Sequence, residues 1–188
     1  MYLDSYLGEV VKIEVKEAIE KRKSIRSYKQ EQVPFEYLKE MIDAARLAPT
    51  ARNVQPTRFK IIESFELRNK LKEEKIFPQD FVTTAPCILV CYGNPDDYLV
   101  KLPDASREDN IQRIERDIAI QTAFLMLRAT DLGLGTCYIA LLDKERIKPI
   151  VGIPDDLYVA YAITVGYSDE EGRERNRLDL DQLYDEEK

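Results

Sequence analysis

Positively charged residues gather near the start of the chain. The stretch Lys21-Arg22-Lys23-Ser24-Ile25-Arg26 holds four cations and a hydroxyl within six residues. A guanidinium offers a planar fork of N–H donors and a serine adds another, so this cluster can hold a phosphate. The alternative is a solvated basic turn on an acidic protein, which is the commoner meaning of a charge cluster taken alone.

A second basic group lies near the other end, where Arg173, Arg175 and Arg177 alternate with other residues of an acidic tail. Alternate side chains of an extended segment point the same way, so Arg175 and Arg177 could share one anion. A tail of balanced charge explains the same pattern without any ligand.

Two further motifs are uncharged or nearly so. In Pro49-Thr50-Ala51-Arg52-Asn53-Val54-Gln55-Pro56, the amides of Asn53 and Gln55 could read the edge of a heteroaromatic ring, although such residues also form ordinary loops. Gly133 and Gly135 permit a tight turn and a close backbone approach. Because they follow a predicted helix rather than a strand, a dinucleotide-binding fingerprint is excluded, and a helix stop is the simpler meaning.

Composition excludes several classes of function. The chain of 188 residues has no histidine, which removes a serine–histidine triad and any histidine-ligated zinc site. Its net charge of −7 argues against nucleic acid as a partner. The odd number of cysteines, Cys87, Cys91 and Cys137, gives no complete disulfide framework, and the first two lie in an apolar run that predicts burial.

No membrane segment is expected. The first fifteen residues carry acidic side chains and no long apolar core, so they do not resemble a signal peptide. The apolar runs are far shorter than the roughly 20 residues that span a bilayer. We therefore expect a cytoplasmic protein that has no membrane partner.

The pattern of apolar residues predicts one domain over residues 1–188. Helices are expected at 14–22, 35–47, 66–75, 109–132 and 143–151, and strands at 59–62, 87–93, 135–142 and 158–167. This order favours an α+β fold with a central, mostly antiparallel sheet flanked by helices. Residues 94–108 are expected to form a long polar loop, of the kind that is often functional.

The longest predicted helix is unusual. The second half of 109–132 is apolar almost all round, so it must be buried on most sides, in a core or in a subunit interface. In a chain of this length we favour an interface for part of it.

Taken together and in order, five stretches resemble the nitroreductase family of flavoproteins. They are RKSIRSY, APTARNVQP, LGLGTCYI, IVGIPDDLYVAYAITVGY and RNRLDLDQL, and they run from about Glu17 to Leu183. The resemblance implies an α/β sandwich that dimerises through long helices. It also implies two FMN sites at the dimer interface, each built from both subunits.

The resemblance assigns cofactor-binding positions by motif. Those of the early motif, on the phosphate, ribityl chain and ring edge, are Arg22, Lys23, Ser24 and Arg26. Those of the loop that the partner subunit contributes are Pro49, Thr50, Ala51, Asn53 and Gln55. Those whose backbone lies along the isoalloxazine are Ile139, Ala140 and Leu141, and the late pair on the phosphate is Arg175 and Arg177.

The chain departs from the family at two places. Many short members have glycines where this chain has Ala140 and Leu141, beside the flavin ring. The position after Gln55-Pro56 is often a large aromatic residue, and here it is Thr57. We therefore expect altered flavin contacts and an altered substrate face.

The activity that the resemblance implies is ping-pong hydride transfer. NADH or NADPH reduces the flavin and leaves, and a nitroaromatic, a quinone or a similar electron-poor acceptor takes its place. The cofactor carries this chemistry, so no side chain need act as a general base. One alternative is a specialised relative, either a flavin-consuming enzyme or a reductive dehalogenase, in which residues 94–108 would form the lid. The others are a non-enzymatic FMN-binding or storage protein and a plain structural protein.

Overall fold

One sheet of four strands organises the protein. A computed structural model describes residues 14–187, and the strands are β1 (Thr57–Ile62), β2 (Cys87–Gly93), β3 (Gly135–Ile139) and β4 (Tyr158–Gly166). Their order across the sheet is β1-β2-β4-β3, and each neighbouring pair is antiparallel. The predicted α+β fold with an antiparallel sheet is confirmed. The expectation that the first fifteen residues are not a signal peptide falls mostly on residues outside the described part.

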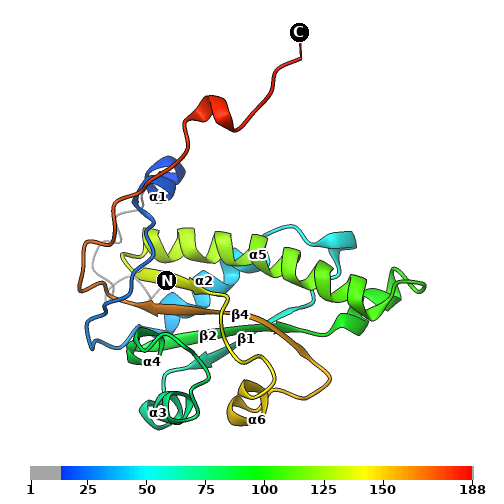
Figure 1. Ribbon diagram of the computed structural model, residues 1–188, viewed down its shortest axis with the longest axis horizontal. Coiled ribbons are helices and arrows are strands. Elements are labelled where there is room, and N and C mark those ends of the chain that lie inside the picture. The colour runs from blue at the N-terminus through cyan, green and yellow to red at the C-terminus, as the bar shows by residue number, and fades with distance from the viewer. Residues whose placement is uncertain (1–13, 188) are drawn as a thin grey trace, which may run out of the picture.

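Helices cover both faces of this sheet (Figure 1). On one face lie α2 (Phe35–Arg46) and α5 (Arg107–Asp131), and on the other lie α3 (Phe65–Glu73), α4 (Phe81–Thr84) and α6 (Ile147–Val151). The short α1 (Val15–Lys21) packs against α5. The result is a layered sandwich with one apolar core on each side of the sheet.

The position of β2 between the two cores explains why its sequence is almost uniformly apolar. Alternate side chains of a strand point to opposite faces. Leu89 therefore packs in the core beneath α2 and α5, whereas Ile88 and Val90 pack in the core over α3 and α6. Cys87 and Cys91 are fully buried in the same strand, as predicted, and burial raises the pKa of the Cys87 thiol to about 12.

The segment after β2 is more ordered than its polar composition predicts. Pro95–Val100 forms a short 3-10 helix, in which Asn94 caps the start by accepting from the Asp96 N–H at 3.0 Å. Tyr98 in this helix is fully buried. The long helix also begins at Arg107, inside the predicted loop, because the Ser106 side chain caps it. The periodicity of apolar residues does not register such local caps.

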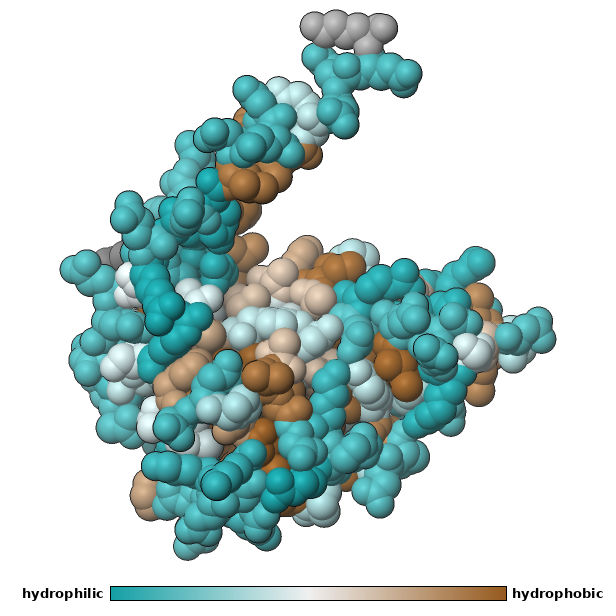
Figure 2. Space-filling model, viewed as in Figure 1, coloured by the Kyte–Doolittle hydropathy of each residue, from teal (hydrophilic) through white to brown (hydrophobic). Residues whose placement is uncertain are grey.

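Two apolar surfaces remain uncovered in the single chain. On α5, Ile120 and Phe124 are each 42% exposed, on the side of the helix away from the core. The segment from Leu178 to Tyr184 projects from the body as an arm (Figure 1), and its apolar side chains are visible in the space-filling view (Figure 2). The core buries one side of the second half of α5, as expected, and the expected interface on its other side stays a prediction. None of the helices formed by residues 14–187 is long and apolar enough to cross a membrane.

The core on the α3 side gives a test of this packing. Leu71 is completely buried, whereas the next residue, Lys72, is exposed. We expect Leu71→Ala to lower the free energy of unfolding by about 2–5 kcal/mol, because it leaves a cavity. Lys72→Ala should change it by less than about 0.5 kcal/mol. Urea denaturation measures both, and equal effects would contradict the packing described.

Candidate functional site

The early basic motif runs along the outer edge of β3. The Ile25 N–H donates to the Thr136 carbonyl oxygen at 2.9 Å, and Ser24 forms a parallel bridge with Thr136. The contact is close because Gly135 has no side chain: a Cβ there would lie 2.7 Å from Ile25 Cγ1. The close backbone approach predicted for the glycine motif is present, and it fixes the early motif against the sheet.

The late arginines come to the same place. The Arg175 guanidinium donates to the carbonyl oxygen of Ile19 at 2.9 Å and also to that of Arg22. Burial lowers the pKa of Arg22, and the nearby charges of Arg175 and Arg177 lower it further. Within residues 14–187, none of these three guanidinium groups forms an ion pair with a carboxylate. Three like charges held together in this way could accommodate an anion, and we call them the candidate anion site.

The rest of the early motif is held by the chain that follows β4. Lys23 Nζ donates to the Glu171 carbonyl oxygen at 3.0 Å. Glu170 Oε1 accepts from the N–H groups of Arg26 at 2.5 Å and Ser27 at 3.3 Å. The sequence analysis did not single out Glu170, since one glutamate in an acidic tail carries no distinctive signal.

Beyond the bridge to Ser24, the outer edge of β3 is open. Ile139 is buried at the end of the strand, whereas Ala140 and Leu141, just past it, are exposed. An edge strand presents unpaired N–H and C=O groups along its free side. The candidate anion site is therefore followed along β3 by open backbone, and then by the two residues that depart from the family.

The loop 49–55 does not join this cluster in the single chain. It leads into β1, which is the opposite edge of the sheet from β3. Three strand spacings separate the two edges, or about 14 Å. The two sites also differ in their position along β4. Thr57 pairs with Gly93, which pairs with Tyr158 at the start of β4, whereas Thr136 pairs with Val165 near the end of β4. This offset adds roughly 23 Å along the strands.

The backbone of this loop has an uncommon conformation. Arg52, Asn53 and Gln55 have φ values of 55°, 56° and 57°, in the left-handed region. Residues other than glycine are disfavoured there, and such strain gathers at functional sites where surrounding contacts impose it. The Thr50 hydroxyl, which accepts from the Gln55 N–H at 3.2 Å, is one such contact.

Comparison with known proteins identifies the family of this chain. The model of the nitroreductase family matches residues 19–78 and 72–167. The chain belongs to the nitroreductase family. The resemblance read from the sequence is therefore confirmed, and with it the assignment to a family of oxidoreductases.

Individual relatives cover most of the chain. An NADH dehydrogenase of Thermus thermophilus is 31% identical over 91% of this chain and 95% of its own. A solved structure from Staphylococcus epidermidis, described provisionally as an NAD(P)H:FMN oxidoreductase, is 26% identical with a TM-score of 0.85, covering 95% of this chain and 99% of that one. An iodotyrosine deiodinase of Thermotoga neapolitana is 25% identical over 80% of this chain and 86% of its own.

A polar cluster that the sequence analysis missed lies where α5 passes β4. Lys144 Nζ donates to Glu115 Oε1 at 3.1 Å and to the Tyr158 hydroxyl at 2.6 Å, and that hydroxyl donates to Glu115 at 2.5 Å. Lys144 also lies 5.7 Å from the centre of the Tyr161 ring. Three residues so distant in sequence give no motif, so periodicity could not reveal them.

The contact between Gly135 and Ile25 can be tested in this family member. Gly135→Ala would force a Cβ into Ile25, and we expect it to lower the free energy of unfolding by about 1–3 kcal/mol. Gly133 has a φ of +75° and no atom within 4 Å of an added Cβ. Because asparagine tolerates this conformation, Gly133→Asn should cost under about 1 kcal/mol. Thermal or urea unfolding compares the two, and the reverse ranking would contradict the close approach.

The cluster at Glu115 predicts a pH dependence of stability. The Tyr158 hydroxyl, and then Lys144, lower the pKa of Glu115 below its ordinary value of 4.5. A carboxyl whose pKa is lower in the folded state adds stability above its unfolded pKa, and this is lost as the pH falls through the folded pKa. Wild type should therefore exceed Glu115→Gln in the free energy of unfolding at pH 7, and the difference should shrink below about pH 4.5. A difference that stays constant down to pH 3 would contradict this.

Proposed function

We propose that this chain is a single-domain, FMN-dependent oxidoreductase, spanning residues 1–188, that takes electrons from NADH or NADPH and passes them to a small electron-poor acceptor such as a nitroaromatic or a quinone. The observation that carries the proposal is the group of guanidiniums of Arg22, Arg175 and Arg177. They gather beside an open strand edge, without a carboxylate partner among the described residues, in a protein whose net charge is −7. The S. epidermidis relative's description names FMN as well.

The donor set fits a flavin mononucleotide. Its phosphate would lie on Arg22, Arg175 and Arg177, where about two negative charges need to be balanced. Lys23, Ser24 and Arg26 would hold the ribityl chain and the ring edge. The open backbone at Ile139, Ala140 and Leu141 would lie along the isoalloxazine, because that stretch follows the candidate anion site along β3.

Bound FMN would supply the redox chemistry, by accepting a hydride from the nicotinamide and yielding electrons to the acceptor. The residues of the chain position the ligands and balance charge, and no general base is required. We propose a ping-pong order, in which the nicotinamide leaves before the acceptor enters the same place.

We also propose that the working form is a homodimer. Pro49, Thr50, Ala51, Asn53 and Gln55 would complete the site of the other subunit, because in their own chain they lie at the far edge of the sheet. The exposed Ile120 and Phe124 of α5 and the apolar arm that follows Arg177 provide surfaces for a second copy to cover. Analytical ultracentrifugation should give the mass of two chains, and a monomer that binds FMN at full affinity would rule out the shared site.

Arginine variants test the cofactor site. Arg175→Ala should raise the Kd for FMN about tenfold or more, since it removes a charged hydrogen-bond donor from the phosphate. Arg173, two residues away, is exposed and does not act on Arg22, so Arg173→Ala should stay within about twofold of wild type. Quenching of FMN fluorescence measures both constants.

The activity itself is tested by absorbance. Purified protein given FMN should show flavin bands that bleach when NADH or NADPH is added without oxygen, and recover with a quinone. Flavin bands that no nicotinamide bleaches would favour the FMN-storage alternative, and the absence of flavin bands would contradict the proposal.

A second candidate is reductive dehalogenation, which the similarity to the iodotyrosine deiodinase favours. In that case the ordered segment 94–106 would cover a halogenated phenol over the flavin. Comparing kcat/KM for 3-iodotyrosine with that for a quinone separates the two candidates, because a dedicated dehalogenase should prefer the iodinated phenol.

A further inference from the structure

Asp117 is a buried carboxylate in α5, and the most apolar stretch of that helix begins directly after it. The residue is only 4% exposed. None of the lysines or arginines in residues 14–187 forms an ion pair with it. Burying a carboxylate without a cation costs several kcal/mol unless hydrogen bonds satisfy it. Core packing therefore does not explain why a carboxylate occupies this position.

The hydrogen bonds to Asp117 come from two other segments. The Ala51 N–H donates to Oδ2 at 3.0 Å and to Oδ1 at 3.2 Å, and the Tyr98 hydroxyl donates to Oδ2 at 2.6 Å. Burial, followed by Asp117 itself, raises the pKa of Tyr98, so this hydroxyl remains a donor. One carboxylate thus joins the loop 49–55 to the segment 94–106.

The loop has a particular need for such a fixed point. Three of its residues, Arg52, Asn53 and Gln55, have positive φ, at a cost of about 1 kcal/mol or more each. They persist only where neighbouring contacts over-determine the backbone. Ala51 directly precedes the first of them, so its bond to Asp117 fixes the backbone where the strained turn begins.

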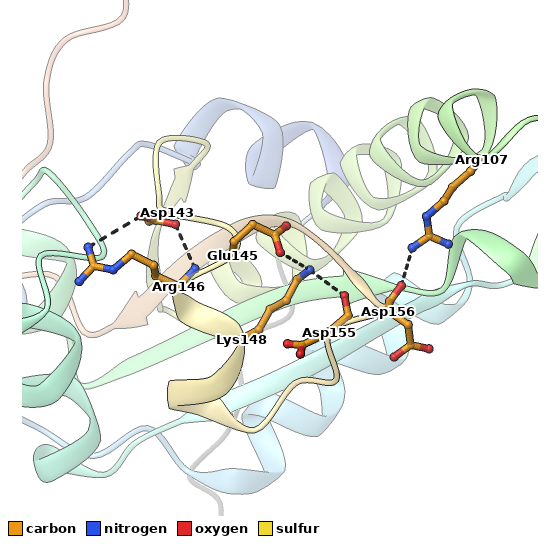
Figure 3. Close-up of polar contacts among 7 residues, drawn as sticks. All are labelled: Arg107, Asp143, Glu145, Arg146, Lys148, Asp155 and Asp156. Carbon is orange, nitrogen blue, oxygen red and sulfur yellow. Dashed lines mark hydrogen bonds and ion pairs between the residues drawn. The ribbon is translucent and has the colours of Figure 1, made fainter.

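The segment on the other side of Asp117 is itself held at its ends. Arg107, in the first turn of α5, pairs with Asp96 at 3.1 Å. It also donates to the Asp156 carbonyl oxygen at 2.6 Å (Figure 3). Lys148 Nζ donates to the carbonyl oxygen of Asp155, which directly precedes Asp156, at 3.1 Å (Figure 3). Tyr98 is fully buried in this segment, and its hydroxyl donates to the carboxylate that accepts from the Ala51 N–H.

We propose that Asp117 is a positioning residue for the cofactor: its carboxylate imposes the conformation in which loop 49–55 meets FMN, and Tyr98 orients that carboxylate. The inference rests on the proposed function. Asp117 need not touch the flavin, because it acts through the backbone of Ala51.

Asp117→Asn separates positioning from packing. The amide keeps the size of the carboxylate but removes its charge and turns one oxygen into a donor that faces the Ala51 N–H. The weakened hydrogen bonds should lower the free energy of unfolding by no more than about 3 kcal/mol, so the variant should still fold. We expect the Kd for FMN to rise about tenfold or more, and amide exchange of residues 50–55 in the FMN-free protein to quicken. Loosening that is confined to residues 50–55 in a folded protein, together with weaker FMN binding, is a result that a merely structural role would not give.

Two further variants complete the test. Tyr98→Phe removes only the hydroxyl and should weaken FMN binding less than Asp117→Asn. The effects of the two should be less than additive in the double variant, since they act on one contact. Glu73→Gln changes an exposed carboxylate on α3 and should leave both the exchange and the Kd unchanged. If Asp117→Asn fails to fold, Tyr98→Phe carries the same readouts.

The outcomes distinguish this inference from the function on which it rests. If Asp117→Asn binds FMN within twofold of wild type and residues 50–55 exchange at the wild-type rate, the inference is wrong. If wild type takes up no FMN, the proposed function fails, and the exchange rates still show whether Asp117 holds the loop.

Discussion

The mutual repulsion of three guanidinium groups is the constraint on which the site depends. Arg22 approaches from the end of α1, while Arg175 and Arg177 approach from the chain after β4. Holding like charges together costs free energy, and an anion lying among them would offset that cost. Much of the surrounding structure serves this arrangement. The bridge from Ser24 to Thr136, the absence of a side chain at Gly135 and the hydrogen bonds of Arg175 to carbonyl oxygens all fix the cluster in place.

The order of the strands divides the site. Because β3 and β1 form opposite edges, one chain presents its candidate anion site at one edge and its strained loop at the other. A nitroreductase-family sandwich that joined two copies would bring one edge of each together. In the proposed homodimer, a second chain would cover the exposed apolar residues of α5 and of the arm. In that proposed homodimer, Asp117 would fix the shape of loop 49–55 before the loop meets the other subunit.

Much of the fold could be predicted from periodicity, because its elements are long and their apolar faces are regular. The helix at 35–47 and the strand at 87–93 differ from α2 and β2 by at most one residue. What could not be predicted rests on single caps and distant pairs. Ser106 starts α5 inside the expected loop, and Tyr98 is buried in a stretch that looks polar.

Some parts of the candidate site could be predicted from the sequence and others could not. Both basic clusters were recognisable because several cations in a short stretch of an acidic chain are a chemical signal, although only the structure shows that they meet. Asp117 carried no distinct signal, because Glu115 and Arg116 directly precede it and its contact is with Ala51, 66 residues away in the chain. No local pattern contains that pairing.

The most direct measurement compares FMN with riboflavin, which lacks the phosphate. Titration of the purified protein with each, followed by flavin fluorescence, isolates the part of the affinity that the candidate anion site supplies. The account predicts that FMN binds at least about a hundredfold more tightly than riboflavin, because several charged hydrogen bonds to the phosphate are lost. Equal dissociation constants for the two flavins would contradict it.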